Sequence, residues 1–70
     1  FERGDYSKAL RHIDRALTIA PFRHKWRNYR GKVFMAMGRR KDAIADWKSV
    51  LKEHPDDEEA RVLLQGVGID

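Results

Sequence analysis

The sequence predicts an all-α protein, and three observations support this prediction. Apolar residues recur at steps of three and four along most of the chain, which is the spacing of one face of a helix. Glycine and proline divide the chain at even intervals, at Gly4, Pro21, Gly38 and Pro55, and both residue types end helices. No stretch shows the apolar and polar alternation of a half-buried strand. We therefore expect helices joined by short turns.

The first helix is expected over residues 6–19, because Asp5 is a capping residue and Pro21 disfavours helical conformation in the residue before it. Its apolar residues form one continuous stripe, made of Ala9, Leu10, Ile13, Ala16, Leu17 and Ala20. A stripe of this kind needs a neighbour that covers it.

The second helix is expected over residues 22–37, with Gly38 as its C-terminal cap. Its apolar side chains cover more than one face, which predicts burial on two sides; they are Trp26, Tyr29, Val33, Phe34, Met35, Ala36 and Met37.

The third helix is expected over residues 41–53 and ends before Pro55. Its apolar face consists of Ala43, Ile44, Trp47, Val50 and Leu51. A short last helix is expected over residues 57–65, where Asp56 and Glu59 resemble a capping box.

The chain also repeats itself at an offset of 34 residues. The aligned pairs match in size and in place on the helix: Gly4 and Gly38, Ala9 and Ala43, Leu10 and Ile44, Ile13 and Trp47, Ala16 and Val50, Leu17 and Leu51, Pro21 and Pro55. Several small or helix-ending residues in one register form a specific signal, whereas a lone glycine or proline does not.

This period is that of the tetratricopeptide repeat, and the sequence resembles that family along nearly its whole length. Gly31 and Phe34 match the Gly-x-x-aromatic pattern of its first helix, Ala43 and Trp47 match A-x3-F in its second, and Pro55 closes the repeat. The resemblance implies that the two helices cross closely at Gly31 and Ala43, with large side chains packed around that contact.

The resemblance further implies a short right-handed solenoid of antiparallel helix-turn-helix repeats, with about four helices. Residues 1–70 are then a single unit: the second helix of one repeat at 1–21, a complete repeat at about 24–57, and a terminal helix at about 57–66. Phe1 is interpreted as the end of a preceding helix. We expect either further upstream repeats or a second copy of the chain to cover the stripe of the first helix.

The second helix departs from the family pattern at two positions. Arg27 and Arg30 stand where the family has Trp and Leu, and Trp26 and Tyr29 each lie one residue earlier. Either this helix is rotated relative to the family, or the arginine stems lie along apolar surface with their charged ends in water.

The charge of the chain is unevenly distributed. Fifteen basic and 11 acidic residues give a net charge of +4. The middle of the chain carries the cations Arg23, Lys25, Arg27, Arg30, Lys32, Arg39, Arg40 and Lys41 without an acid among them. The end carries the acids Glu53, Asp56, Asp57, Glu58, Glu59 and Asp70. We therefore expect a basic middle and an acidic end.

No pattern in the sequence points to catalysis, a metal or a cofactor, so we expect a protein that is not an enzyme. Cysteine is absent, which fits the cytoplasm as the default compartment without establishing it. The three histidines, His12, His24 and His54, lack the spacing of a metal motif. No apolar run approaches the roughly 18 residues that a membrane span needs.

The family resemblance places a partner-binding groove along the first helix of each repeat. The groove positions correspond to Lys25, Asn28, Lys32 and Met35, which share one helical face. Two ammonium groups and an amide suit an acidic or C-terminal peptide. Glu59 and Leu63 stand where some family members carry basic groups that grip a terminal carboxylate, so a complete clamp of that kind is not expected.

Three functions follow from these features. The leading hypothesis is a protein-interaction scaffold that binds a partner peptide or helix. The second is self-association, either head to tail, with the basic middle of one copy on the acidic end of another, or through the uncovered face of the first helix. The third is nucleic-acid binding by the mixed basic and aromatic second helix, which is disfavoured because its cations encircle the helix and the acidic end repels phosphate.

Overall fold

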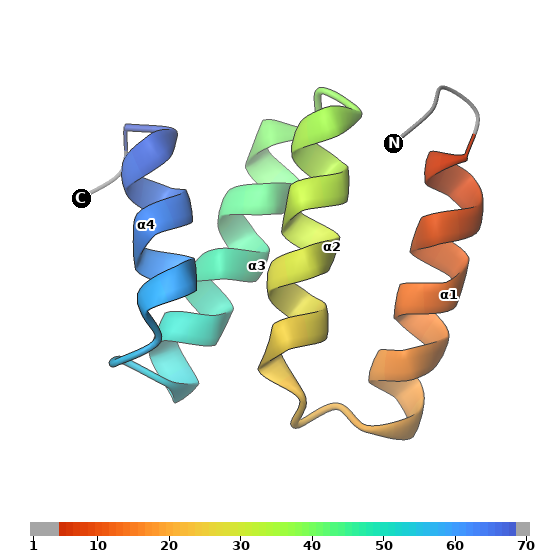
Figure 1. The fold of residues 1–70 in the computed structure, drawn as a ribbon, viewed down its shortest axis with the longest axis horizontal. Coiled ribbons are helices and arrows are strands. Elements are labelled where there is room, and N and C mark those ends of the chain that lie inside the picture. Colours follow the sequence, from red (N-terminus) through yellow and green to blue (C-terminus); the bar gives the residue numbers. More distant parts are fainter. Residues whose placement is uncertain (1–4, 69–70) are drawn as a thin grey trace.

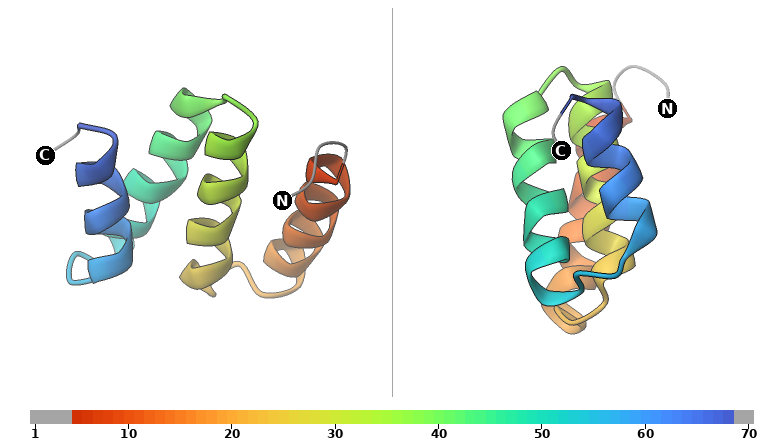
Figure 2. Two further views of the ribbon diagram at one scale, coloured as in Figure 1. Left: turned by 45° about the horizontal axis from the view of Figure 1, so that its top comes forward. Right: turned by 90° about the vertical axis from the view of Figure 1, so that its left-hand side faces the viewer.

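The computed structural model describes residues 5–68, which form four α-helices and no strand. The helices are α1 (Tyr6–Ile19), α2 (His24–Ala36), α3 (Arg40–Glu53) and α4 (Glu58–Gly66). Successive helices run antiparallel, and α2 and α4 lie on the same side of α3 (Figures 1 and 2). The prediction of an all-α fold is confirmed for these residues.

The helix bounds agree with the expected ones to within two residues. The first helix is as expected, whereas the second begins at His24 rather than at residue 22. The start is later because Pro21 and Phe22 form a turn, which the Arg23 amide closes by donating to the Ala20 carbonyl at 3.1 Å. The third helix begins one residue earlier than expected, and the last is shifted by one residue toward the C-terminus.

The caps explain two of these bounds. Gly38 follows α2 with a φ of 81°, the left-handed conformation that glycine adopts without strain, and so ends the helix as expected. The expected capping box of Asp56 and Glu59 is wrong, because Asp57 is the N-cap residue and its Oδ2 accepts from the Ala60 amide at 2.9 Å. The expected cap role of Gly4 lies outside the described residues.

The expected capping of the first helix by Asp5 is correct in position only. Asp5 occupies the N-cap position of α1, but its side chain makes no capping hydrogen bond.

The largest cluster of buried residues is centred on α3. Ala43, Trp47 and Val50 of α3 pack with Ala60 and Leu64 of α4. Partly buried apolar side chains surround this cluster, namely Phe34, Met35, Ile44, Leu51, Leu63 and Val67. The core therefore joins α2, α3 and α4, and α1 lies at its edge.

The close crossing of α2 and α3 depends on Gly31. A Cβ atom at this position would overlap the indole ring of Trp47. The same indole donates from Nε1 to the Asn28 carbonyl at 3.2 Å, which fixes the ring against α2. The expected crossing is at Gly31 and Ala43 with large side chains around it, and the structure places the large side chain of Trp47 directly against Gly31.

The apolar stripe of α1 is less exposed than expected. Ile13 is buried where α1 packs against α2, and the other members of the stripe are half-buried. The expectation that the stripe lies uncovered is thus wrong for its central residue, because α2 already covers it. The most exposed apolar side chain of α1 is instead Ile19, at 77%.

The fold repeats itself at the same offset as the sequence. The first residues of α1 and α3 are 34 positions apart (40 − 6), as are those of α2 and α4 (58 − 24). The residue that follows α1, Ala20, has φ −137° and ψ 75°, and the residue that follows α3, His54, has φ −132° and ψ 75°. The Arg23 amide donates to Ala20, and the Asp57 amide donates to His54 at 3.0 Å. The two turns are therefore equivalent.

Candidate interaction groove between α2 and α4

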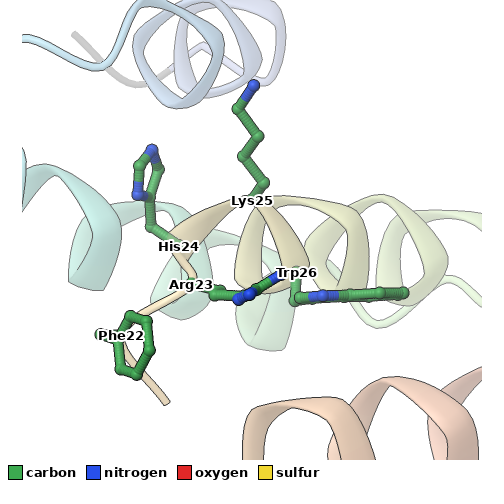
Figure 3. Close-up of a pocket in the computed structure, with 5 residues that line it drawn as sticks. All are labelled: Phe22, Arg23, His24, Lys25 and Trp26. Atoms are coloured by element: carbon green, nitrogen blue, oxygen red, sulfur yellow. The ribbon is translucent and has the colours of Figure 1, made fainter. Parts of the chain in front are cut away.

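The four expected groove residues lie on the side of α2 that faces α4, but their environments differ. Lys25 is exposed and extends toward α4 (Figure 3). Asn28 is buried, at 1% exposure, Lys32 is exposed, and Met35 is half-buried.

Asn28 links α2 to α4. Its Nδ2 donates to Asp57 Oδ2 at 3.0 Å and to Glu59 Oε1 at 3.1 Å, so both of its donor hydrogens are engaged within the chain. Its Oδ1 is buried without a hydrogen-bond partner. The Asn28 amide thus positions the start of α4.

Lys32 is also engaged by an acid of α4. Its Nζ lies 2.9 Å from Glu59 Oε2, with both side chains nearly half exposed. The hydrogen bond from Lys32 is the largest influence on the Glu59 carboxyl and, against the opposing effect of burial, holds its pKa below the ordinary value. The positive charge expected for the groove is therefore partly neutralised within the molecule, and Lys25 is left as its unpaired cation.

Asp57 is the centre of this junction. Burial raises its pKa, but hydrogen bonds from the Ala60 amide and the Asn28 side chain and the nearby imidazole of His24 together lower it. His24 Nε2 lies 3.1 Å from Asp57 Oδ1, and the His24 ring lies against that of His54, with centroids 4.1 Å apart. These contacts fix α4 relative to α2 and give the groove a rigid end.

Beyond this junction, the space between α2 and α4 is an open apolar hollow of about 430 Å³. Its lining consists of Lys32, Met35, Trp47, Val62, Leu63, Gly66 and Val67. A second hollow of about 440 Å³ shares Lys32, Val62 and Leu63 and adds Glu58 and Glu59. The two together form a groove with one charged end and one apolar end.

The groove contains residues that sequence analysis did not select. One of them is Val62, which is 61% exposed although it is apolar and on a helix. The 34-residue offset could have identified Val62, because residue 62 of α4 lies 34 positions after Asn28, an expected groove residue of α2. Of the expected residues, the structure brings Lys32 and Met35 together in the groove lining, and Asn28 lies beneath it.

Arg27 and Arg30 lie between helices, and their charged ends do not extend into open water. Arg30 donates from Nε and Nη2 to both carboxylate oxygens of Asp46, at 2.9 and 2.6 Å, and from Nη1 to Asp14 at 2.8 Å. Its guanidinium bridges α1 and α3, and the Asp46 hydrogen bonds, against burial, raise its pKa above the ordinary value.

Arg27, three residues before Arg30 on α2, makes similar contacts with α3. Its Nη1 donates to Ser49 Oγ at 3.2 Å and lies 3.7 Å from Glu53. Both arginines thus occupy the inner side of α2, which turns Trp26 and Tyr29 toward its surface, where each is 37% exposed.

Residues 5–68 hold no group of three or more His, Asp or Glu side chains placed to bind a metal ion. None of the helices in this part of the chain is long and apolar enough to cross a membrane. The chain matches no protein-family model, no curated protein and no solved structure.

Proposed function

We propose that this chain is a protein-interaction scaffold of the tetratricopeptide-repeat type, which binds a partner peptide or helix in the groove between α2 and α4. The sequence resemblance supports this proposal, as do the equivalent turns and the close crossing of Gly31 with Trp47. In a right-handed solenoid of such repeats, α2 and α4 are successive first helices and line the concave face.

The observation that carries the proposal is the apolar hollow beside Val62. The Val62 side chain is 61% exposed and lies at an open hollow that Met35 and Val67 also line. Most pockets that bind ligands are apolar with a few polar groups that fix orientation. Here Lys32, Glu58 and Glu59 supply those groups at one end.

The partner that fits this groove has an apolar anchor and, farther along toward the start of α2, an acidic residue. The anchor occupies the hollow, and the acidic residue pairs with Lys25, which has no ion pair among the described residues. The sequence predicts an acidic peptide that faces both lysines. Because the Lys32 ammonium already pairs with Glu59, the acidic residue of the partner is now placed at Lys25.

The test is a selection of peptides from a random library against the 70-residue chain, followed by affinity measurement on variants. Val62→Glu places a charge in the hollow and should weaken binding at least tenfold, and Lys25→Glu should weaken selectively the peptides that carry an acid. Gln65→Glu is the matched control, because Gln65 is exposed on the same helix but does not line the groove.

All variants should keep the helical content of the wild type by circular dichroism. Chemical shifts of the bound chain should change along α2 and α4. Selected peptides that bind Val62→Glu as tightly as wild type would show that the groove is not the binding site.

A further inference from the structure

The opposite border of α2, where it meets α1, carries a second unoccupied surface. A hollow of about 320 Å³ lies between the end of α1 and the start of α2, lined by Ala16, Ile19, Ala20, Arg23 and Trp26. Figure 3 shows Arg23 and Trp26 together at the border of α2 toward α1, whereas His24 and Lys25 point to the other side. We call this surface, with Arg15, the α1–α2 edge.

The internal repeat shows what shape of partner this edge accepts. At the 34-residue offset, Ala16 corresponds to Val50 and Trp26 to Ala60, and both of these later residues are fully buried. Both belong to the buried cluster of α3 and α4, and Asn28 of α2 binds next to this cluster through Trp47 of α3 and through Asp57, the N-cap residue of α4. Because the α1–α2 and α3–α4 turns are equivalent, the α1–α2 edge has the form of a surface that accepts a helix.

The α1–α2 edge carries the opposite charge to the corresponding surface of α3 and α4. Asp57 accepts from Asn28 and pairs with His24, but the corresponding residue of the edge is Arg23. Ser49 accepts from Arg27, but its counterpart is Arg15. At Ser49 and Asp57, α2 supplies the hydrogen-bond donors. On the α1–α2 edge the guanidinium groups of Arg15 and Arg23 are the donors, so a helix bound there has to supply the acceptors.

These cations are available to a partner. Arg15 and Arg23 are exposed and take part in none of the ion pairs among the described residues. By contrast, Arg27, Arg30 and Lys32 of the same region all have acidic partners. An unpaired positive charge beside exposed Ile19 and half-exposed Trp26 is complementary to an acidic, amphipathic surface.

We propose that the α1–α2 edge binds an acidic amphipathic helix of a partner protein, seated as α2 is seated on α3 and α4. The counterparts of His24 and Asn28 in that helix face Arg23, and the counterpart of Arg27 faces Arg15. The partner helix therefore carries carboxylates at positions i, i+3 and i+4, beside an apolar stripe that packs on Ala16, Ile19 and Trp26.

The described helices of a second copy of this chain do not supply the partner helix. Among the described helices, two acids four residues apart occur at Asp42 and Asp46, but Asp46 is buried and bound to Arg30. The acids at the start of α4 are followed by Arg61 and Val62 at the corresponding positions. No helix in this part of the chain thus offers the exposed carboxylates that the edge requires.

A polypeptide helix also fits better than a nucleic acid. The hollow is lined by the aliphatic side chains of Ala16, Ile19 and Ala20 together with Arg23 and Trp26, a surface that accepts the apolar side chains of a helix. Single-stranded nucleic acid is held by successive bases stacked on aromatic rings, and among the lining residues Trp26 alone carries such a ring.

The probe that tests the proposal is a synthetic helical peptide with an apolar stripe of Leu and Ala and with Glu at i, i+3 and i+4. Its control is the same peptide with Lys at those three positions. Binding of both to the 70-residue chain is measured by fluorescence anisotropy, together with Arg15→Glu, Arg23→Glu and Lys48→Glu. Lys48 is an exposed, unpaired cation on α3 and is the matched control.

The Glu peptide should bind the wild type, lose at least tenfold in affinity with Arg23→Glu, and stay within about twofold with Lys48→Glu. The Lys peptide should bind the Arg15→Glu, Arg23→Glu double variant better than it binds the wild type. Ile19→Ser, at a residue that is 77% exposed, should weaken the Glu peptide several-fold without loss of helix content.

Three results would overturn the proposal. The first is equal loss of affinity with Arg23→Glu and Lys48→Glu, which would indicate unspecific charge attraction. The second is a concentration-dependent dimer in sedimentation that Arg23→Glu abolishes, which would assign the edge to a second copy. The third is a single-stranded oligonucleotide that binds the edge more tightly than the Glu peptide in 150 mM salt, on the order of physiological ionic strength. The groove variant Val62→Glu should leave binding of the Glu peptide to the α1–α2 edge unchanged, so the two proposed sites can be tested separately.

Discussion

At the scale of single residues, two positions govern how closely the helices approach. Gly31 allows α2 to lie directly against the Trp47 indole, because there is no Cβ between them. Asp57 ends the α3–α4 turn and at the same time accepts from Asn28 and Ala60. Each residue thus connects a local feature, a missing side chain or a helix cap, to a contact between helices.

Gly31→Ala should destabilise the protein although alanine is the better helix former. The gain in helix propensity is about 1 kcal/mol, but overpacking against Trp47 costs roughly 1–3 kcal/mol. Urea unfolding measures the difference. Gly66→Ala is the matched control, because a Cβ there meets nothing within 4 Å, and it should be neutral or stabilising. Equal effects of the two changes would contradict the close crossing.

Asp57→Asn should reduce the loss of stability in acid. The pKa values of Asp57 and Glu59 are lowered in the folded protein from ordinary values of 3.8 and 4.5. Their contribution to the free energy of unfolding is therefore complete above those ordinary values and is lost as the pH falls through the lower folded pKa. Asparagine retains the cap but not the charge.

Thermal unfolding from pH 7 to pH 2 measures this dependence. Asp56→Asn, at an exposed neighbour that makes no side-chain hydrogen bond or ion pair within residues 5–68, should keep the acid dependence of the wild type. If both variants show the wild-type profile, the Asp57 carboxylate does not contribute as the geometry requires.

At the scale of helices, Arg30 holds three elements together. Its guanidinium pairs with Asp46 of α3 and Asp14 of α1 from a position on α2. The two carboxylates are not equivalent, since the Asp46 side chain is 8% exposed and that of Asp14 is 58% exposed. The α2–α3 contact therefore depends on this arginine more than the α1–α2 contact does.

Arg30→Ala should be strongly destabilising, by about 3 kcal/mol, because it leaves the buried Asp46 carboxylate without its partner. Asp14→Ala should cost less than about 1 kcal/mol, as for an exposed ion pair. The double variant Arg30→Met, Asp46→Leu should recover most of the loss, since it removes both charges. Urea unfolding of Arg30→Met, Asp46→Leu and the double variant forms a double-mutant cycle, and additive effects of the two single changes would show that Arg30 and Asp46 do not stabilise each other.

At the scale of the whole molecule, the packing is uneven. The extents of 31 × 27 × 15 Å describe a flat array of helices. Its main buried cluster lies in α3 and α4, with partly buried side chains of α2 packed against it. Among the residues of α1, Ile13 alone is buried. A chain of this size buries only about 60% of its unfolded surface, so such differences within it are expected to affect local stability.

Hydrogen exchange should therefore show weaker protection in α1 than in α3. The amides in the middle of α1 should exchange through local opening, and those around Trp47 and Val50 through global unfolding. An acidic peptide bound to the α1–α2 edge should raise the protection of α1 toward that of α3. Equal protection of α1 and α3 in the free chain would contradict the uneven core.

The sequence by itself determined the helices and their register. Helix positions depend on local properties, namely the spacing of apolar residues and the placement of Pro21, Gly38 and Pro55, and the bounds agree to within two residues. The repeat pattern also predicted a close crossing at Gly31, but the direct contact of Gly31 with the Trp47 indole came from the structure. The function proposed from that pattern stays a prediction.

Only the tertiary structure decided which partners the polar side chains have. The spacing of Asn28 and Lys32 showed that they share a face, but not that Glu59 binds both of them from the next helix. Likewise, the sequence left two alternatives for Arg27 and Arg30, and the fold supplied carboxylates for both. Pairing between helices depends on how the helices pack in three dimensions, which local spacing does not contain.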